Sequence, residues 1–148
     1  MYNKQVRVYR KYDKADRYIV GFEYNSIVYI AVVKSLRSAW LFRMRESGKK
    51  TYKVQMRLTK KDKQKLINKG AMPVMSYGNF VTLGYNNGDS LERVIREHFG
   101  LEHKHDNLPF YKGVDITVNG VGYSIKWENA QICTYRTIAK LENAEKAV

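Results

Sequence analysis

Polar and apolar residues alternate most regularly in two neighbouring stretches, residues 114–118 and 121–127. Alternation with a period of two is typical of a β-strand that is buried on one face. Between the two stretches lies Asn119-Gly120, the dipeptide preferred at the centre of a two-residue type I′ turn. The pattern therefore predicts a β-hairpin in which Val118 pairs with Val121, with one apolar face and one polar face.

The polar face of this predicted hairpin brings three chemical groups together. If Val118 pairs with Val121, Asp115 lies opposite Ser124, and Lys126 is its diagonal neighbour at roughly 7–8 Å between backbones. A carboxylate holds a hard cation through oxygen, the cation lowers the pKa of its bound water, and a lysine orients that water or stabilises developing charge. These groups suit phosphodiester hydrolysis. The alternative is a surface hairpin whose outer face is merely polar.

A helix is predicted just upstream of the hairpin. Apolar residues follow helical spacing within residues 89–100, and Gly100 is a natural stop. Glu92 lies at the edge of this apolar stripe, from which it can point toward the polar face of the hairpin. Alternatively, Glu92 only satisfies the start of the helix, because Asp89 and Glu92 have the spacing of a capping box.

A second helix is expected to begin near Asn129, which would place Gln131 and Tyr135 on one of its faces. A helix glutamate, a strand aspartate, a strand lysine and then Gln-x-x-x-Tyr, in this order, resemble the PD-(D/E)xK nuclease superfamily. Within this superfamily the motif most resembles that of RecB-like and phage exonuclease members, to which archaeal Holliday-junction resolvases are related. The resemblance covers about residues 86–135 and implies a core like that of restriction endonucleases.

The resemblance also implies roles for individual residues. Glu92 and Asp115 would hold Mg²⁺ or Mn²⁺, and Lys126 would assist the attacking water. Gln131 and Tyr135 would orient the site or the substrate. Where the family carries a second carboxylate this chain has Ser124. Glu128, two residues after Lys126, is then either a displaced third metal ligand or a solvated residue in the first turn of the last helix.

The charge of the chain is the second strong signal. The net charge is +13, and residues 1–88 hold 19 Lys and Arg against 5 Asp and Glu, whereas residues 89–148 hold 8 against 9. Tyrosine, phenylalanine and tryptophan are interleaved with the basic residues, as in surfaces that grip phosphates and stack bases, although the same aromatics also suit a packed sheet. Nucleic acid, DNA or RNA, is the expected partner, and a membrane surface is not favoured because no basic amphipathic helix with a wide apolar face is present.

The basic half of the chain is expected to be mostly strands. They are placed at Gln5–Tyr12, Tyr18–Tyr24, Ile27–Lys34, Trp40–Arg45 and Thr51–Leu58, with turns at Asn25-Ser26 and around Gly48. A short basic helix follows at residues 59–70, then a strand pair at Val74–Tyr77 and Phe80–Leu83. The residues expected to contact phosphates are Lys60, Lys61, Lys63, Lys65, Arg43, Arg45, Lys49 and Lys50.

These elements predict an α+β protein. A basic, mostly antiparallel sheet in residues 1–85 would precede a helix–hairpin–helix module in residues 86–148, and the two parts would be separate or share one core. The single cysteine, Cys133, is expected to be a packing residue and fits a reducing, cytoplasmic setting. His103 and His105 are a weaker candidate pair for zinc or another transition metal.

The leading functional prediction is nucleic-acid binding with Mg²⁺-dependent cleavage of phosphodiester bonds. A second prediction is a non-catalytic binder on a nuclease-like scaffold, which Ser124 favours. Such a protein would block or recruit nucleic-acid-processing proteins or ribonucleoproteins, in the manner of phage-encoded or mobile-element anti-defence proteins. A third prediction is an RNA-binding module.

Overall fold

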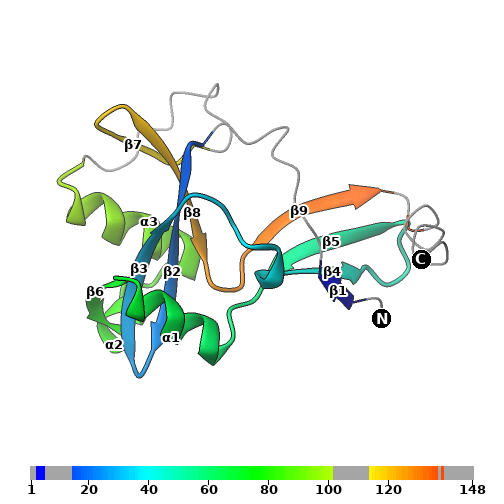
Figure 1. Ribbon diagram of the computed structural model, residues 1–148, viewed down its shortest axis with the longest axis horizontal. Coiled ribbons are helices and arrows are strands. Elements are labelled where there is room, and N and C mark those ends of the chain that lie inside the picture. Colours follow the sequence, from blue (N-terminus) through cyan, green and yellow to red (C-terminus); the bar gives the residue numbers. More distant parts are fainter. Residues whose placement is uncertain (1–2, 6–14, 102–113, 137, 139–148) are drawn as a thin grey trace. The chain divides into compact units, whose positions relative to one another are not determined.

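The computed structural model describes residues 3–5, 15–101, 114–136 and 138 (Figure 1). The chain forms two compact units. Unit 1 consists of Met1–Val8, Arg37–Arg57 and Asn129–Val148, and unit 2 consists of Tyr9–Leu36 and Leu58–Glu128. Each unit is therefore assembled from separate stretches of the chain, and this division differs from the expected split between residues 85 and 86.

Unit 2 is built on a five-stranded sheet in the order β6-β3-β2-β8-β7. The strands are β2 (Arg17–Tyr24), β3 (Ile27–Val33), β6 (Met72–Ser76), β7 (Ile116–Val118) and β8 (Val121–Trp127). All neighbours pair antiparallel except β2 and β8, which run parallel. The α+β class with a mostly antiparallel sheet is as expected from the sequence.

Two tight turns fix the register of this sheet. Asn119 and Gly120 have φ angles of 50° and 80°, as a type I′ turn requires, and Val118 pairs with Val121. The β2–β3 turn is made the same way by Asn25 and Ser26, with φ angles of 48° and 65°. Both turns and the predicted register of the β7–β8 hairpin are confirmed.

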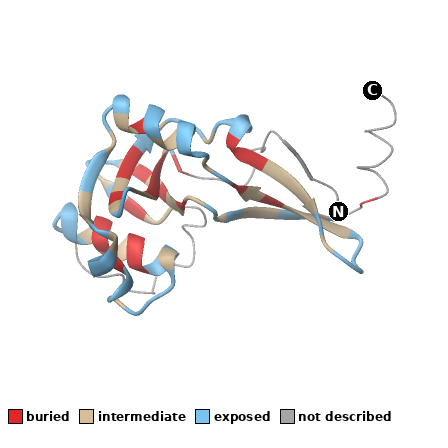
Figure 2. Cartoon of the chain, turned by 90° about the horizontal axis from the view of Figure 1, so that it is seen from below, coloured by how far each residue is buried: buried red, intermediate tan, exposed pale blue. Residues whose placement is uncertain are grey.

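Two helices cover opposite faces of the unit 2 sheet (Figures 1 and 2). Helix α3 (Asn87–His98) buries Leu91 and Ile95 in a core cluster that includes Ile19 and Trp127. Helix α1 (Lys60–Asn68) lies within the predicted basic helix, starts with a capping box formed by Thr59 and Asp62, and buries Leu66. Asn86, rather than Asp89, caps α3, because its side chain accepts from the backbone N–H of Asp89.

The strand predicted at Phe80–Leu83 is wrong. That segment belongs to the short helix α2 (Tyr77–Val81), whose N-cap Ser76 accepts from the backbone N–H of Asn79. Phe80 is 1% exposed and stacks on Trp127 at 5.0 Å between ring centroids. Gly78-Asn79, between the two predicted strands, suits a tight turn, but the burial of Phe80 in the core and the Ser76 cap together favour a helix here.

Unit 1 contains a four-stranded antiparallel sheet in the order β1-β4-β5-β9. Its elements are β1 (Asn3–Gln5), a 3₁₀ turn η1 (Ser38–Trp40), β4 (Leu41–Arg45), β5 (Thr51–Met56) and β9 (Gln131–Arg136). The helix predicted to begin near Asn129 is therefore wrong, since that stretch is strand β9. Isoleucine, threonine and tyrosine at 132, 134 and 135 suit a strand, and β5 supplies the pairing partner.

Some expectations fall outside the described residues, namely most of the strand at Gln5–Tyr12 and the histidines His103 and His105. None of the helices in the part of the chain that the structure describes is long and apolar enough to cross a membrane.

Candidate functional site

Asp115, the predicted metal ligand on the hairpin, is engaged with backbone. Its carboxylate accepts a hydrogen bond of 2.6 Å from the backbone N–H of Ile125, and its own N–H donates to the carbonyl of Tyr123 at 2.8 Å. The side chain thus takes the place of a strand partner at the open end of the β7–β8 hairpin. The carboxylate has a structural role here, because it accepts a hydrogen bond from the backbone N–H of Ile125 on β8.

Glu92, the second predicted ligand, forms an ion pair on its own helix. The carboxylate lies 3.6 Å from the Arg96 guanidinium, and these side chains are 19% and 15% exposed. The same guanidinium nitrogen donates to the backbone carbonyl of Asp115 at 2.5 Å. Arg96 thus binds the carboxylate of Glu92 and the backbone carbonyl of Asp115, the two residues that were expected to share a cation.

Lys126 lies on the face of the sheet away from α3, which carries Glu92 and Arg96. Tyr123, Ile125 and Trp127 of β8 pack with the α3 core cluster, so the alternating side chains Ser124 and Lys126 point away from α3. In the described part of the chain no hydrogen bond or ion pair joins Lys126 to Asp115. Ser124 is only 2% exposed, so it presents no accessible oxygen to a substrate.

Glu128 and Lys63 are partners of one another. The Lys63 ammonium lies 2.8 Å from the Glu128 carboxylate, with side chains 13% and 21% exposed. That ammonium also donates to the carbonyl of Glu23, and the Glu128 carboxylate accepts from the backbone N–H of Glu23 at 2.8 Å. The pair fastens α1 to the end of β2, which leaves Glu128 unsuited to the metal and Lys63 unsuited to phosphate.

Gln131 and Tyr135 belong to unit 1, whereas the carboxylates and Lys126 belong to unit 2. Tyr135 stacks on its cross-strand neighbour Tyr52 at 5.2 Å between ring centroids, and Gln131 donates to the hydroxyl of Thr134. Within the described residues no group of three or more His, Cys, Asp or Glu side chains is placed to hold a metal ion. The predicted catalytic set is therefore distributed over two faces of one unit and a strand of the other.

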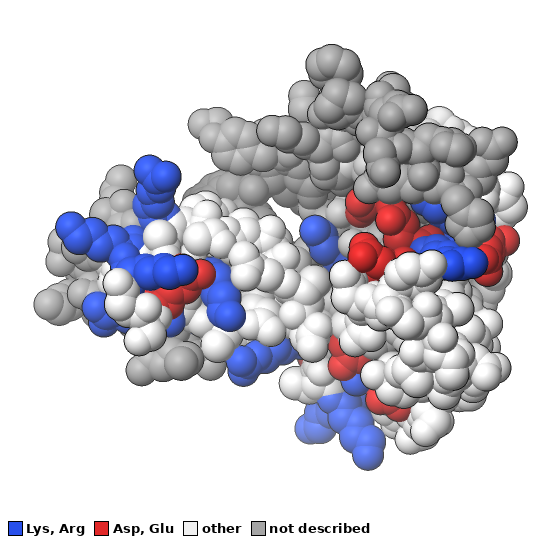
Figure 3. Space-filling model, turned by 180° about the vertical axis from the view of Figure 1, so that it is seen from behind, with Lys and Arg blue, Asp and Glu red and all other residues white. Residues whose placement is uncertain are grey.

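Positive charge is concentrated in unit 1. The stretches that form this unit contain 12 Lys and Arg against 3 Asp and Glu, whereas unit 2, twice as long, contains 15 against 11. On the face shown in Figure 3, the surface of unit 1, on the left, carries abundant blue and little red, and unit 2 shows both colours. Among the described residues of unit 1 the acidic side chain is Glu46, which accepts from the Thr51 hydroxyl beside the β4–β5 turn.

The unit 1 sheet has one buried face and one accessible face. Leu41, Val54 and Met56, which share a face through the β4–β5 register, are at most 1% exposed. The opposite face, here called the basic face, is at least partly exposed at every position. We define the basic face by eight of its positions: Phe42, Met44, Thr51, Lys53, Gln55, Arg57, Thr134 and Arg136.

Arg57 is held over the basic face by two side chains of β4. Its guanidinium carbon lies 5.9 Å from the centroid of the Phe42 ring, within the range of a cation–π contact. One of its terminal nitrogens donates to the sulfur of Met44 at 3.5 Å. The result is an exposed planar cation beside an aromatic ring, with Lys53 and Arg136 on the same face.

The candidate phosphate contacts fall into three groups. Arg45, Lys49 and Lys50 are exposed at the end of the β4–β5 hairpin, and Lys60, Lys61 and Lys65 are exposed on α1 of unit 2. Arg43 lies half-buried on the opposite side of the sheet from the basic face, near Tyr52. Burial raises the pKa of Tyr52, and the positive charge of Arg43 opposes that rise. Lys53, Arg57 and Arg136 were missed, because their shared face follows only from the pairing of β4, β5 and β9.

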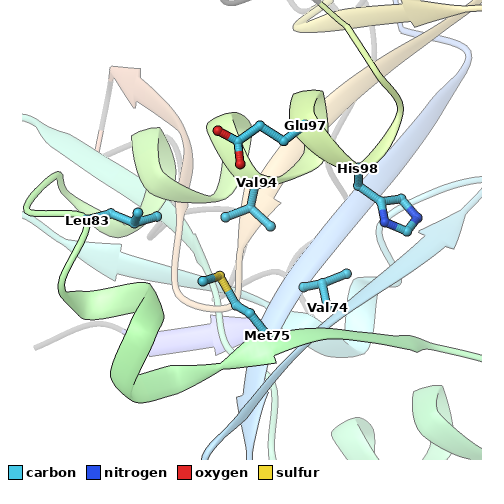
Figure 4. Close-up of a pocket in the computed structure, with 6 residues that line it drawn as sticks. All are labelled: Val74, Met75, Leu83, Val94, Glu97 and His98. Carbon is cyan, nitrogen blue, oxygen red and sulfur yellow. The ribbon is translucent and has the colours of Figure 1, made fainter.

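A pocket of about 300 Å³ lies in unit 2 between β6 and α3 (Figure 4). It is lined by Val74, Met75, Leu83, Val94, Glu97 and His98. Val74 and Met75 are consecutive yet both face the space, because the β3–β6 pairing is irregular at this point. The Glu97 carboxylate at the margin lies 3.4 Å from Arg93. The lining of the pocket combines four apolar side chains with Glu97 and His98, and it contains none of the residues that were expected to be catalytic.

No protein-family model matches the chain, and neither a curated protein nor a solved structure matches it.

Proposed function

We propose that this protein binds nucleic acid through the sheet of unit 1 and acts as a binder rather than as a nuclease. The observation that carries the proposal is the concentration of charge, 12 Lys and Arg against 3 Asp and Glu, in a unit that contains one small sheet. A surface of this kind attracts polyanions and gains affinity by releasing their counterions. The exposed ends of Arg45, Lys49 and Lys50 add to it at the hairpin.

Cleavage has less support than binding. A magnesium site needs carboxylate oxygens that are free to converge on one cation. Here Asp115 accepts from Ile125, Glu92 pairs with Arg96 and Glu128 pairs with Lys63. Each carboxylate thus already has a partner within the protein, and among the described residues no three His, Cys, Asp or Glu side chains converge on one point.

Binding is tested by fluorescence anisotropy with labelled oligonucleotides over a range of salt concentrations. The triple variant Arg45→Glu, Lys49→Glu, Lys50→Glu should weaken binding at least about tenfold and reduce the slope of log affinity against log salt by about two to three. The matched control is Lys60→Glu, Lys61→Glu, Lys65→Glu on α1, which changes the net charge equally but in unit 2. Equal losses in both variants would mean that net charge alone, and not the unit 1 sheet, governs binding.

Cleavage is tested on the same oligonucleotides with Mg²⁺, Mn²⁺ or EDTA, and we expect them to remain intact in all three. Lys126→Gln is the informative variant, because no hydrogen bond or ion pair to Asp115 is lost with it. Cleavage that needs a divalent ion and disappears in Lys126→Gln would contradict a binder and restore the nuclease prediction.

A further inference from the structure

We infer that the basic face of unit 1 selects single-stranded nucleic acid, with an unpaired base stacking on the Arg57–Phe42 pair. The inference rests on the proposed function, since it names the class of nucleic acid that the proposed surface takes. DNA and RNA strands present the same features to this face, an exposed base plane and a phosphate backbone.

The arrangement of Arg57 is the first part of the argument. The guanidinium is a flat, delocalised cation that stacks well on aromatic rings, and its own solvent-facing side offers the same flat surface to a base. Phe42 beneath it and Met44 beside it fix its orientation at 5.9 Å and 3.5 Å. Because Arg57 is exposed and already oriented, a base can stack there with little further loss of side-chain freedom.

The spacing of the cations on the same face is the second part. Lys53 is level with Met44 on β4 and with Thr134 on β9, and Arg136 is level with Thr51. Neighbouring strands lie about 4.8 Å apart, and residues of one face recur about every 6.8 Å along a strand. Lys53 therefore lies about 14 Å along β5 from Arg57, and Arg136 lies about 20 Å along the sheet and one strand further over, so that both can contact phosphates a few nucleotides away from the base held by Arg57.

The absence of acidic residues among the eight positions of the basic face is the third part. A phosphate chain meets no carboxylate at these positions themselves, and the Glu46 carboxylate, which accepts from the Thr51 hydroxyl, lies at the turn end of the face, away from the Arg57–Phe42 pair. A duplex could use the cations but not the stacking pair, because its base planes are covered by their neighbours and only base edges reach the grooves. A duplex would instead favour the β4–β5 hairpin, whose basic end resembles a ribbon that enters a groove.

The test compares single strands of DNA and RNA with the corresponding duplexes by fluorescence anisotropy at fixed salt. The wild type should bind single strands at least about tenfold more tightly than duplexes. Phe42→Leu, which keeps an apolar side chain, and Arg57→Lys, which keeps the charge, should each weaken single-strand binding about tenfold and leave duplex binding unchanged. Neither should alter the salt dependence, whereas Lys53→Gln and Arg136→Gln should each lower the slope by about 0.7.

Matched controls come from unit 2, where Arg93 lies 5.5 Å over the ring of the exposed Tyr85. Tyr85→Leu and Arg93→Lys remove the same kind of stacked pair at another site and should leave binding unchanged. Circular dichroism and thermal unfolding of each variant check that the fold is retained.

The outcomes separate the two proposals. If duplexes bind as tightly as single strands, and Phe42→Leu has no effect while the lysine and arginine variants do, the single-strand inference is wrong and the proposed function stands. If the wild type binds neither form, or the cation variants change nothing, the proposed function is wrong as well. If Tyr85→Leu weakens binding as much as Phe42→Leu, the site is not the basic face.

Discussion

Lys63 has a structural role that is not evident from its position in the sequence. It lies in a run of lysines on α1, yet its neighbours Lys61 and Lys65 are exposed while its own ammonium contacts Glu128 and the carbonyl of Glu23. Its side chain is 13% exposed, so the pair is shielded from water more than a surface ion pair is. One lysine of the run thus anchors α1 while the others remain solvated.

Lys63→Ala should therefore lower the free energy of unfolding by about 1–3 kcal/mol, because it leaves the Glu128 carboxylate partly buried without its cation. Lys61→Ala, on the exposed side of the same helix, should change it by less than about 0.5 kcal/mol. Urea unfolding of the two variants measures the difference. Equal stabilities would show that the Lys63–Glu128 pair contributes no more than a surface ion pair.

The sequence indicates which residues lie near one another in the hairpin, but it does not indicate which cations pair with the carboxylates of the predicted site. The turn at Asn119-Gly120 pairs Val118 with Val121 and brings Asp115 beside Tyr123 and Ile125 of β8, and this part of the predicted site could be derived because the hairpin is local. The partners that engage the carboxylates could not. Arg96 meets Asp115 only when α3 packs on the sheet, and Lys63 meets Glu128 across 65 positions of the chain.

At the scale of the elements, the close approach of α3 to the sheet depends on one glycine. A Cβ atom at Gly21 of β2 would lie 2.4 Å from a methyl carbon of Leu91, which is fully buried on α3. No real contact is that short, so the helix and the strand can meet here only because position 21 has no side chain. The Arg96 contact to Asp115 belongs to the same packing of α3 on the sheet.

Gly21→Ala should destabilise the protein by about 1–3 kcal/mol through overpacking. Gly78→Ala is the matched control, since nothing lies within 4 Å of a Cβ at that position. Alanine there also suits helix α2. Thermal unfolding compares the two, and an unchanged midpoint for Gly21→Ala would show that α3 moves away from β2 at little cost.

Elements with local signals could be predicted, and those that depend on distant partners could not. Thr59 with Asp62, and the turns at Asn25-Ser26 and Asn119-Gly120, specify α1 and two hairpins within a few residues. By contrast, β9 is a strand because β5 pairs with it, and α2 is a helix because Phe80 reaches Trp127. The parallel pairing of β2 with β8 has no local signal at all.

At the scale of the whole molecule, the chain passes repeatedly between its units. The stretch Arg37–Arg57 of unit 1 lies between β3 and α1 of unit 2 in the sequence, and β9 follows directly after β8. The basic residues of the first 88 positions are consequently divided between the units. Charge that looks like one basic half in the sequence becomes one strongly basic unit and one mixed unit.

The fragment 86–148 should not fold on its own. It contains α3, β7 and β8 without β2, the strand to which β8 pairs, and β9 without its partner β5. Such a fragment leaves two strand edges and the α3 core face uncovered. Circular dichroism with thermal melting measures this, and a cooperative transition in the fragment would contradict the division of the units given above.

The pairing of β2 with β8 also limits when the sheet of unit 2 can form during translation. β2 ends at Tyr24 and β8 begins at Val121. Roughly 100 residues must therefore be translated before β2 gains its second neighbour, which takes about 5–20 s at ordinary elongation rates. During this interval the nascent chain carries a finished β2–β3 hairpin with one bare edge and an apolar surface, the kind of structure that other chains and chaperones capture. The sheet of unit 2 can therefore be completed only after β8 has been synthesised, and until then the edge of β2 remains open to other strands.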